Sequence, residues 1–202
     1  MKHMPRSSKT YMPTYIIIAM NMAAYAYTSI LSGNFVEMNY SVVRQYGQFN
    51  LFVLNGWYWQ LFTSMFVHVN IAHLLGNIVF LLIFGLRAEE LFKIEQYLAV
   101  YFIPGLAGNL LTLLFGPDMV SAGASGAIFG LFGACTIYVR RAVGQSIFGA
   151  LIYSFFLLMM STGPNVNNLA HLGGLAVGLL IGYILAAKRK IRTVYKYSYS
   201  YP

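Results

Sequence analysis

The segment VSAGASGAIFGLFG, residues 120–133, decides how this chain can fold, because small residues recur through it at helical spacing. Gly126, Gly130 and Gly133 form one stripe along a helix that begins near Ser125. A stripe of small residues lets the backbones of two membrane helices approach closely. The segment therefore predicts a helix that packs against a partner along its glycine face.

A second glycine-rich segment, LAHLGGLAVGLLIG at residues 169–182, predicts that partner. Gly174 and Gly178 lie three and seven residues after His171, so all three share one helical face, and Gly182 continues the row. We expect the two glycine-faced helices to pack against each other. Ser125 and His171 then lie at neighbouring helix ends, close enough to form a hydrogen bond.

The composition excludes most soluble classes of protein. Hydrophobic residues make up 58% of the 202 residues and charged residues only 9%, whereas a soluble domain carries about 25% charged residues. An aromatic content of 16% excludes a disordered chain, and a single cysteine, Cys135, excludes a disulfide scaffold. So few polar side chains cannot cover a water-soluble globule. The composition predicts an all-α, polytopic protein of the lipid bilayer.

Long uncharged stretches predict six membrane-spanning helices in a single domain. We expect them at residues 15–31, 71–91, 96–116, 125–139, 146–160 and 169–187. The aromatic segment 47–70 is interrupted by glycine and asparagine, which favours a loop in the membrane interface over a span. Outside the six-span domain, 15–187, residues 1–14 are expected to form a short N-terminal segment and 188–202 a basic, tyrosine-rich tail.

Positive charge is distributed unevenly between the two sides that this topology defines. Of the 13 Lys and Arg residues, all but Arg44 fall on the side of the two termini. Cytoplasmic loops of membrane proteins are enriched in Lys and Arg. We therefore expect a multi-pass protein of the cell membrane with both termini in the cytoplasm. The net charge of +8 reflects this topology and does not indicate a nucleic-acid partner.

Polar residues gather at the starts of three predicted spans, all near the extracytoplasmic face. Ser125 begins the fourth span, His171 begins the sixth, and His73 and Asn77 lie in the first turns of the second. A serine hydroxyl is a weak nucleophile until a base such as histidine accepts its proton. The backbone N–H of Ser125, the His73 ring and the Asn77 amide are suitable donors for an oxyanion. The residue types therefore indicate acyl-transfer chemistry.

Two simpler interpretations remain open from the residues alone. Ser125 can be the N-cap of its helix, and His171 can be a lone histidine that donates to a backbone carbonyl. The five acidic residues lie away from His171 in the predicted topology, which favours a Ser–His dyad over a triad. His68 and His73 have no carboxylate or thiolate beside them, so we expect neither a metal site nor a cofactor.

In this order and at this spacing, the motifs resemble those of rhomboid intramembrane serine proteases of the prokaryotic type, which have a six-span core. The resemblance covers about residues 15–187. The matching motifs are Trp59-Gln60, His68 with His73-x-x-x-Asn77, Gly123-Ala-Ser125-Gly126, and Ala170-His171-Leu-Gly-Gly174-Leu-Ala-Val-Gly178. Gln60 is a departure, because many members carry an arginine after the tryptophan.

The resemblance implies a role for each polar residue of the motifs. Ser125 would be the nucleophile and His171 the general base. His73 and Asn77 would donate hydrogen bonds to the oxyanion, and His68 would steady the first loop. The fifth span and the loop 161–168 would be the gate and cap through which a substrate helix reaches the site.

The resemblance also implies roles for smaller residues and one aromatic ring. Gly174 and Gly178 match the close contact of the sixth helix with the fourth, where Gly126 faces them, and Gly123 supports the turn before Ser125. Phe129 stands where many relatives have a tyrosine stacked on the catalytic histidine. It retains the ring and loses the hydroxyl, so we expect His171 to be held more loosely.

The hypothesis is an endopeptidase that cleaves single-span membrane proteins within or near their transmembrane helix. Its expected partners are transmembrane substrates and the lipid bilayer, with no metal and no nucleic acid. One alternative is a non-catalytic rhomboid-like scaffold that binds transmembrane helices in the same groove. Another is a small transporter, but transporters place polar residues near the midplane, and here they are predicted near one face.

Overall fold

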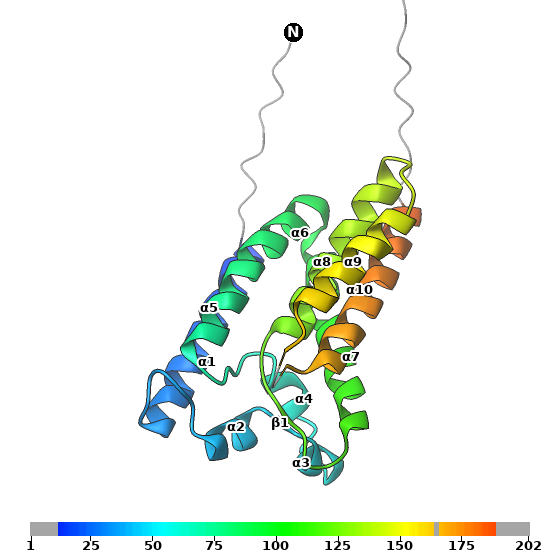
Figure 1. The fold of residues 1–202 in the computed structure, drawn as a ribbon. Coiled ribbons are helices and arrows are strands. Elements are labelled where there is room, and N and C mark those ends of the chain that lie inside the picture. Colours follow the sequence, from blue (N-terminus) through cyan, green and yellow to red (C-terminus); the bar gives the residue numbers. More distant parts are fainter. Residues whose placement is uncertain (1–11, 164–165, 189–202) are drawn as a thin grey trace, which may run out of the picture.

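The computed structural model describes residues 12–163 and 166–188, and within them the chain is a bundle of helices with one short strand pair (Figure 1). The predicted terminal segments, 1–14 and 188–202, lie almost wholly outside the described residues. The long helices are α1 (Met12–Ser32), α5 (Ile71–Phe80) continued by η1 (Leu81–Gly85) and α6 (Leu86–Leu91), α7 (Ile94–Thr112) with η2 (Leu113–Phe115), α8 (Ser125–Ala142), α9 (Phe148–Met160) and α10 (Asn168–Ala187). The short elements are α2 (Tyr40–Tyr46), β1 (Gln48–Phe49), α3 (Asn50–Leu54), α4 (Gln60–Thr63) and β2 (Val120–Ser121).

The helices confirm the predicted helical membrane bundle. Among the described residues, four helical segments are long and apolar enough to cross a bilayer: 12–32, 71–91, 94–115 and 168–187. The second of these contains the π-helical segment η1, which the sequence pattern did not predict. α9 has 13 residues and is therefore only ~20 Å long, and α8 ends in Arg140 and Arg141. The six-span count stays a prediction for these two helices.

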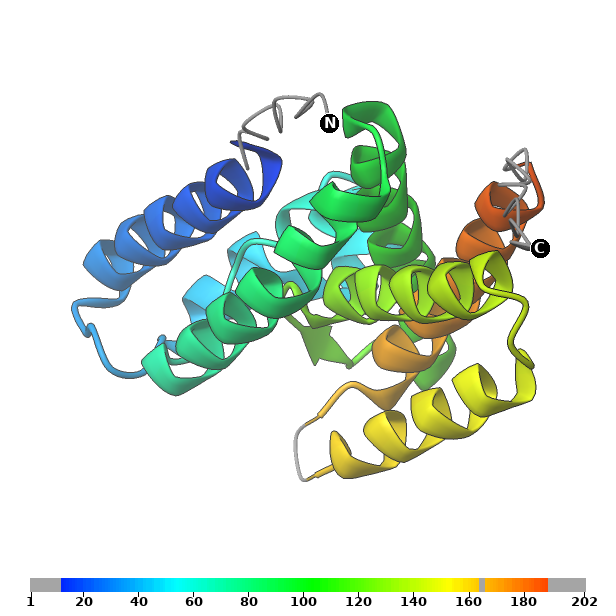
Figure 2. The ribbon, with the colours of Figure 1, turned by 90° about the horizontal axis from the view of Figure 1, so that it is seen from above.

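α8 lies at the centre of the bundle and packs against both α7 and α10, which also contact each other (Figure 2). Its contact with α10 is made by backbone atoms, because glycines face each other along the two helices. A Cβ added to Gly174 would overlap the Gly126 carbonyl oxygen, and one added to Gly178 would overlap that of Gly130. Gly182 faces the backbone of Ala134 in the same way. The glycine spacing therefore fixes how closely α8 and α10 approach.

The segment between α1 and α5 folds into short helices at one end of the bundle, and it forms no span (Figure 1). Its strand β1 pairs antiparallel with β2, with Gln48 opposite Ser121 and Phe49 opposite Val120. β2 ends four residues before Ser125. The strand pair therefore connects this loop to the turn that precedes α8.

Gln60 holds the loop together from inside, although the family pattern suggested a cation after Trp59. It is fully buried, its Oε1 accepts from the Phe49 N–H at 2.9 Å, and its Nε2 donates to the Arg44 carbonyl at 2.8 Å. The guanidinium of Arg44 lies 4.2 Å from the centre of the Phe49 ring. The loop therefore has a cation from another position, stacked on an aromatic side chain.

His68 lies in the same loop, directly before α5, and is fully buried. Its Nδ1 donates to the Phe66 carbonyl at 3.1 Å, a bond that closes the turn before α5. Burial, together with a smaller effect of the nearby His73, lowers the pKa of His68 to about 3. The folded loop therefore holds this ring in its neutral form.

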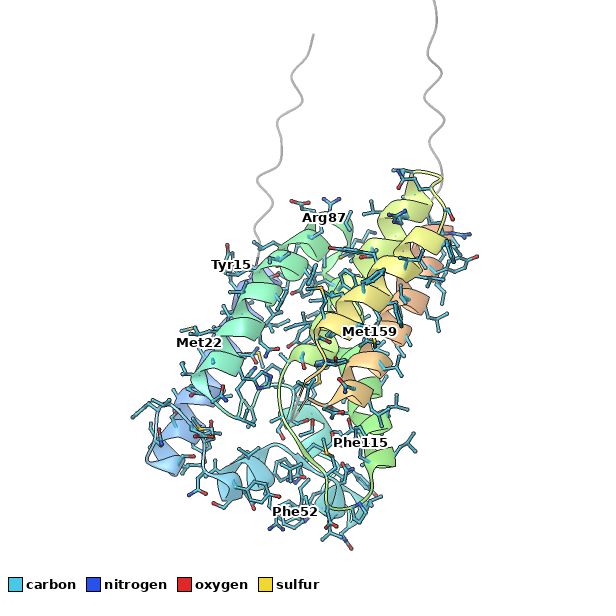
Figure 3. All side chains as sticks on the ribbon, viewed as in Figure 1. Tyr15, Met22, Phe52, Arg87, Phe115 and Met159 are labelled. Carbon is cyan, nitrogen blue, oxygen red and sulfur yellow. The ribbon has the colours of Figure 1, made fainter. Side chains whose placement is uncertain are left out.

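The charged side chains of the described residues lie mostly at the end of the bundle opposite this loop. Figure 3 shows Arg87 at one end and Phe52 at the other. At the Arg87 end, the Glu89 carboxylate accepts from the Thr14 N–H at 2.7 Å and joins α6 to the start of α1. This uneven distribution agrees with the charge pattern of the sequence.

The glycine contact can be tested with two matched substitutions in helices. We expect Gly178→Ala to lower the free energy of unfolding by about 1–3 kcal/mol, because the methyl group forces α10 away from α8. Gly76→Ala, on α5, adds a Cβ that meets no atom within 4 Å and should not destabilise the fold. Unfolding in detergent micelles measures both. Equal losses in the two variants would contradict the close contact.

The burial of His68 predicts a dependence of stability on pH. The unfolded chain binds a proton at this ring near pH 6.5, whereas the folded chain binds it only near pH 3. The free energy of unfolding therefore decreases as the pH falls from 6.5 to 3. The loss should reach on the order of 4 kcal/mol. Titration of unfolding in micelles between pH 7 and 3 should show a steeper loss in the unmutated protein than in His68→Gln. Parallel curves would count against a buried neutral ring.

Candidate active site

A cavity of about 960 Å³ lies among α5, α8, α9 and α10, and it is lined by His73, Asn77, Ser125 and His171 but not by His68. His73 and Asn77 enter it from α5, Ser125 from α8, and His171 from α10. Apolar side chains such as Phe132 and Leu157 form the rest of its wall. The cavity therefore combines a small number of polar groups with an apolar surround, which is typical of a ligand site.

Ser125 and His171 are joined directly. The Ser125 Oγ lies 2.8 Å from Nε2 of His171, across 46 residues of sequence. Ser125 is the first residue of α8, Ala124 occupies the cap position, and that helix end has no side-chain cap. The N-cap interpretation of Ser125 is therefore wrong. The His171 ring is buried and stacks on Phe129, with ring centres 4.6 Å apart and an angle of 27° between the planes.

The start of α10 is fixed by Asn167, whose role the sequence did not predict. Its Oδ1 accepts from the Ala170 N–H at 3.0 Å and so caps the helix. Its Nδ2 donates to the hydroxyl oxygens of Thr112 and Ser121, each at 2.7 Å. Asn167 therefore ties the first turn of α10, and with it His171, to α7 and to β2.

A residue that the sequence did not single out touches the other nitrogen of His171. The Oγ of Ser161, at the C-cap of α9, lies 3.3 Å from Nδ1. The same hydroxyl donates to the Leu158 carbonyl at 2.7 Å. Sequence alone gave no periodic or motif signal for this contact, because it depends on how α9 is placed against α10.

His73 faces the cavity from a well-defined helix start. The Oδ1 of Asn70 caps α5 by accepting from the His73 N–H at 2.8 Å. A Cβ on Gly123 would lie 2.7 Å from Cε1 of the His73 ring, and Gly123 also has a φ of +131°. Both facts require glycine at position 123. The rings of His68 and His73 meet edge to face, with centres 5.1 Å apart.

Asn77 lies one turn after His73 and lines the same cavity. Its Nδ2 donates to the His73 carbonyl at 2.8 Å, which uses one of its two N–H groups. The second N–H stays available for a bound group. In this resting arrangement the amide therefore braces α5 and can still serve as a donor.

Chemically, this arrangement supplies a nucleophile and a base in contact, at the N-terminus of a helix. Unpaired backbone N–H groups and the positive end of the helix dipole meet at Ser125, where they favour a negative charge. Among the described residues, the hydrogen bonds of the His171 ring go to Ser125 and Ser161 and to no carboxylate. The geometry can support nucleophilic attack without an acidic partner.

Comparison with known proteins gives several relatives. The putative rhomboid protease YdcA of Bacillus subtilis is 35% identical over 150 residues, which cover 71% of this chain and 75% of that protein. RHOMBOID-like protein 1 of Arabidopsis thaliana is 36% identical over 138 residues, or 62% of this chain and 34% of the relative. Rhomboid-like protease 3 of Toxoplasma gondii is 34% identical over 134 residues, or 61% of this chain and 50% of the relative.

The chain thus spans between a third and a half of the plant and Toxoplasma relatives and a larger share of the bacterial one. The family model described as the rhomboid domain matches residues 55–188, which is more than half of the chain. That match includes the helices that bear Ser125, His171, His73 and Asn77. With the helical membrane fold and the cavity described above, these matches establish that the chain belongs to the rhomboid family.

Proposed function

We propose that this rhomboid-family protein is an intramembrane serine endopeptidase that uses Ser125 and His171 as a catalytic dyad. The observation that supports the proposal is the 2.8 Å hydrogen bond between Ser125 Oγ and His171 Nε2 at the wall of a large cavity. A nucleophile and base in this relation are the minimum that acyl transfer requires.

In the proposed reaction, Ser125 Oγ attacks the carbonyl carbon of a substrate peptide bond while His171 Nε2 accepts the hydroxyl proton. The carbonyl oxygen becomes an oxyanion in a tetrahedral intermediate. When the C–N bond breaks, His171 gives its proton to the leaving amine and an acyl ester remains on Ser125. Water then attacks the ester with His171 again as base, which releases the acid and restores the Ser125 hydroxyl.

The oxyanion needs donors directed to one point beside Ser125. Ser125, His73 and Asn77 all line the cavity. We propose the Ser125 backbone N–H at the start of α8, the His73 ring and the second N–H of Asn77 for this role. The His73 ring packs against Gly123, two residues before the nucleophile, which keeps it close to the reacting carbonyl.

The proposed substrates are single-span membrane proteins, cut within or near their transmembrane helix. α9 is an exposed wall of the cavity: Phe155, Phe156 and Met160 are each more than half exposed. This supports the proposal that a substrate enters beside α9 and the loop 161–168. We further propose that the six-span domain 15–187 lies in the cell membrane with both termini in the cytoplasm.

Removal of the nucleophile tests the dyad. We expect Ser125→Ala to abolish cleavage of a labelled single-span substrate in proteoliposomes and to abolish labelling by a fluorophosphonate probe. Ser154→Ala is the matched control, because Ser154 is also a buried serine in a membrane helix but lines no part of the cavity. Wild-type cleavage by Ser125→Ala would refute the proposal. An unmutated protein that never reacts with the probe would favour the non-catalytic scaffold.

The oxyanion role of His73 predicts a specific kinetic effect. Loss of one donor from an oxyanion site costs about 10²–10³-fold in kcat. We therefore expect His73→Ala to lower kcat by that order with little change in KM, measured on the same substrate in micelles. A change confined to KM would show that the ring contacts the substrate without stabilising the transition state.

A further inference from the structure

We infer that Ser161 is a positioning residue for the base: its hydroxyl accepts a hydrogen bond from the Nδ1–H of His171 and so keeps Nε2 unprotonated and facing Ser125. The inference rests on the proposed dyad and adds a third, uncharged member to it. Ser161 comes from the C-terminal end of α9, a different helix from those that bear Ser125 and His171.

The direction of each hydrogen bond follows from what the atoms can donate. The Leu158 carbonyl can only accept, and it lies 2.7 Å from Ser161 Oγ, so the single Ser161 hydroxyl proton is used there. The contact of 3.3 Å between Ser161 Oγ and His171 Nδ1 then needs its proton from the ring. A neutral imidazole with a proton on Nδ1 has none on Nε2. Nε2 is therefore free to accept from Ser125 at 2.8 Å.

The surroundings of His171 show no competing partner for Nδ1 within the described residues. Phe129 covers the face of the ring and offers no acceptor in its plane. The Oδ1 of Asn167 already accepts from the Ala170 N–H, and its Nδ2 donates elsewhere. Within the described residues, Ser161 is thus the side chain that accepts the hydrogen bond from Nδ1 of His171.

In serine proteases with a triad, a carboxylate holds the histidine in the tautomer that can accept the serine proton. A hydroxyl accepts a weaker hydrogen bond than a carboxylate does. The effect of Ser161 should therefore be smaller than that of a triad acid. We expect loss of its hydroxyl to lower kcat by about five- to thirtyfold, with KM within twofold of the unmutated value.

The chain offers a matched control one residue away. Thr162 lies at the same helix end, and its hydroxyl also donates a hydrogen bond to a carbonyl, that of Met159, at 2.7 Å. Unlike the Ser161 hydroxyl, it makes no hydrogen bond with His171 among the described residues. Thr162→Val removes that hydroxyl and retains the shape of the side chain. Comparison of Ser161→Ala with Thr162→Val therefore separates the effect on the base from an effect on the end of α9.

The experiment measures kcat and KM in micelles, and it also measures the ring tautomer of His171. The tautomer is read from the ¹⁵N NMR signals of protein labelled at histidine, and the signal of His171 is identified by its loss in His171→Gln. For Ser161→Ala we expect the drop in kcat and a smaller population with the proton on Nδ1. Ser161→Thr, which keeps the hydroxyl, should restore both to within about threefold, and Thr162→Val should leave the tautomer of His171 unchanged.

An unchanged tautomer and kcat in Ser161→Ala would overturn the inference, as would an equal loss of the proton on Nδ1 of His171 in Thr162→Val. If the unmutated protein cleaves nothing, the proposed function fails on its own. The tautomer of His171 in the unmutated protein and in Ser161→Ala still decides the inference in that case.

Discussion

The contact between α8 and α10 is the constraint on which the rest of the structure depends. In a bilayer, lipid is as apolar as leucine, so helices associate through close packing and not through exclusion of water. Here glycine faces glycine, and the two backbones meet without intervening side chains. Ser125 and His171 occupy the first turns of these two helices. A small increase in the distance between the helices would lengthen the hydrogen bond of 2.8 Å that joins them.

Local patterns predicted this part of the molecule well, because glycine spacing and uncharged stretches report directly on helices. The starts of α5, α8 and α10, and the absence of a span between α1 and α5, follow from them. The family resemblance is confirmed by the domain match. What the sequence did not indicate depends on tertiary placement. The bonds of Gln60 to two distant backbones, and of Ser161 to His171, join segments whose relative position has no periodic signature. The π-helical turn at residues 81–85 is a further case, because its sequence is as apolar as an ordinary helix.

Several amide side chains near the site are engaged in capping or bracing, and this limits the cost of their burial, whereas the buried Nδ1 of His73 has no partner among the described residues. Asn70 and Asn167 cap the helices that bear His73 and His171. Asn109, buried on α7, donates to the Leu61 carbonyl at 2.7 Å and to Ser64 Oγ at 2.9 Å. Buried polar groups are costly when they lack a partner. Amide side chains therefore fix the loops around the cavity where charged groups are excluded by the membrane.

The strand pair of β1 with β2 has a consequence for how this scaffold can diversify. Val120 is held opposite Phe49 by main-chain pairing, yet its side chain also borders the cavity. Main-chain hydrogen bonds do not depend on which side chain is present. The rim of the cavity can therefore change its chemistry at Val120 while the turn that leads to Ser125 keeps its shape. The shape of the turn and the chemistry of the cavity rim are in this way assigned to different atoms of the same short segment.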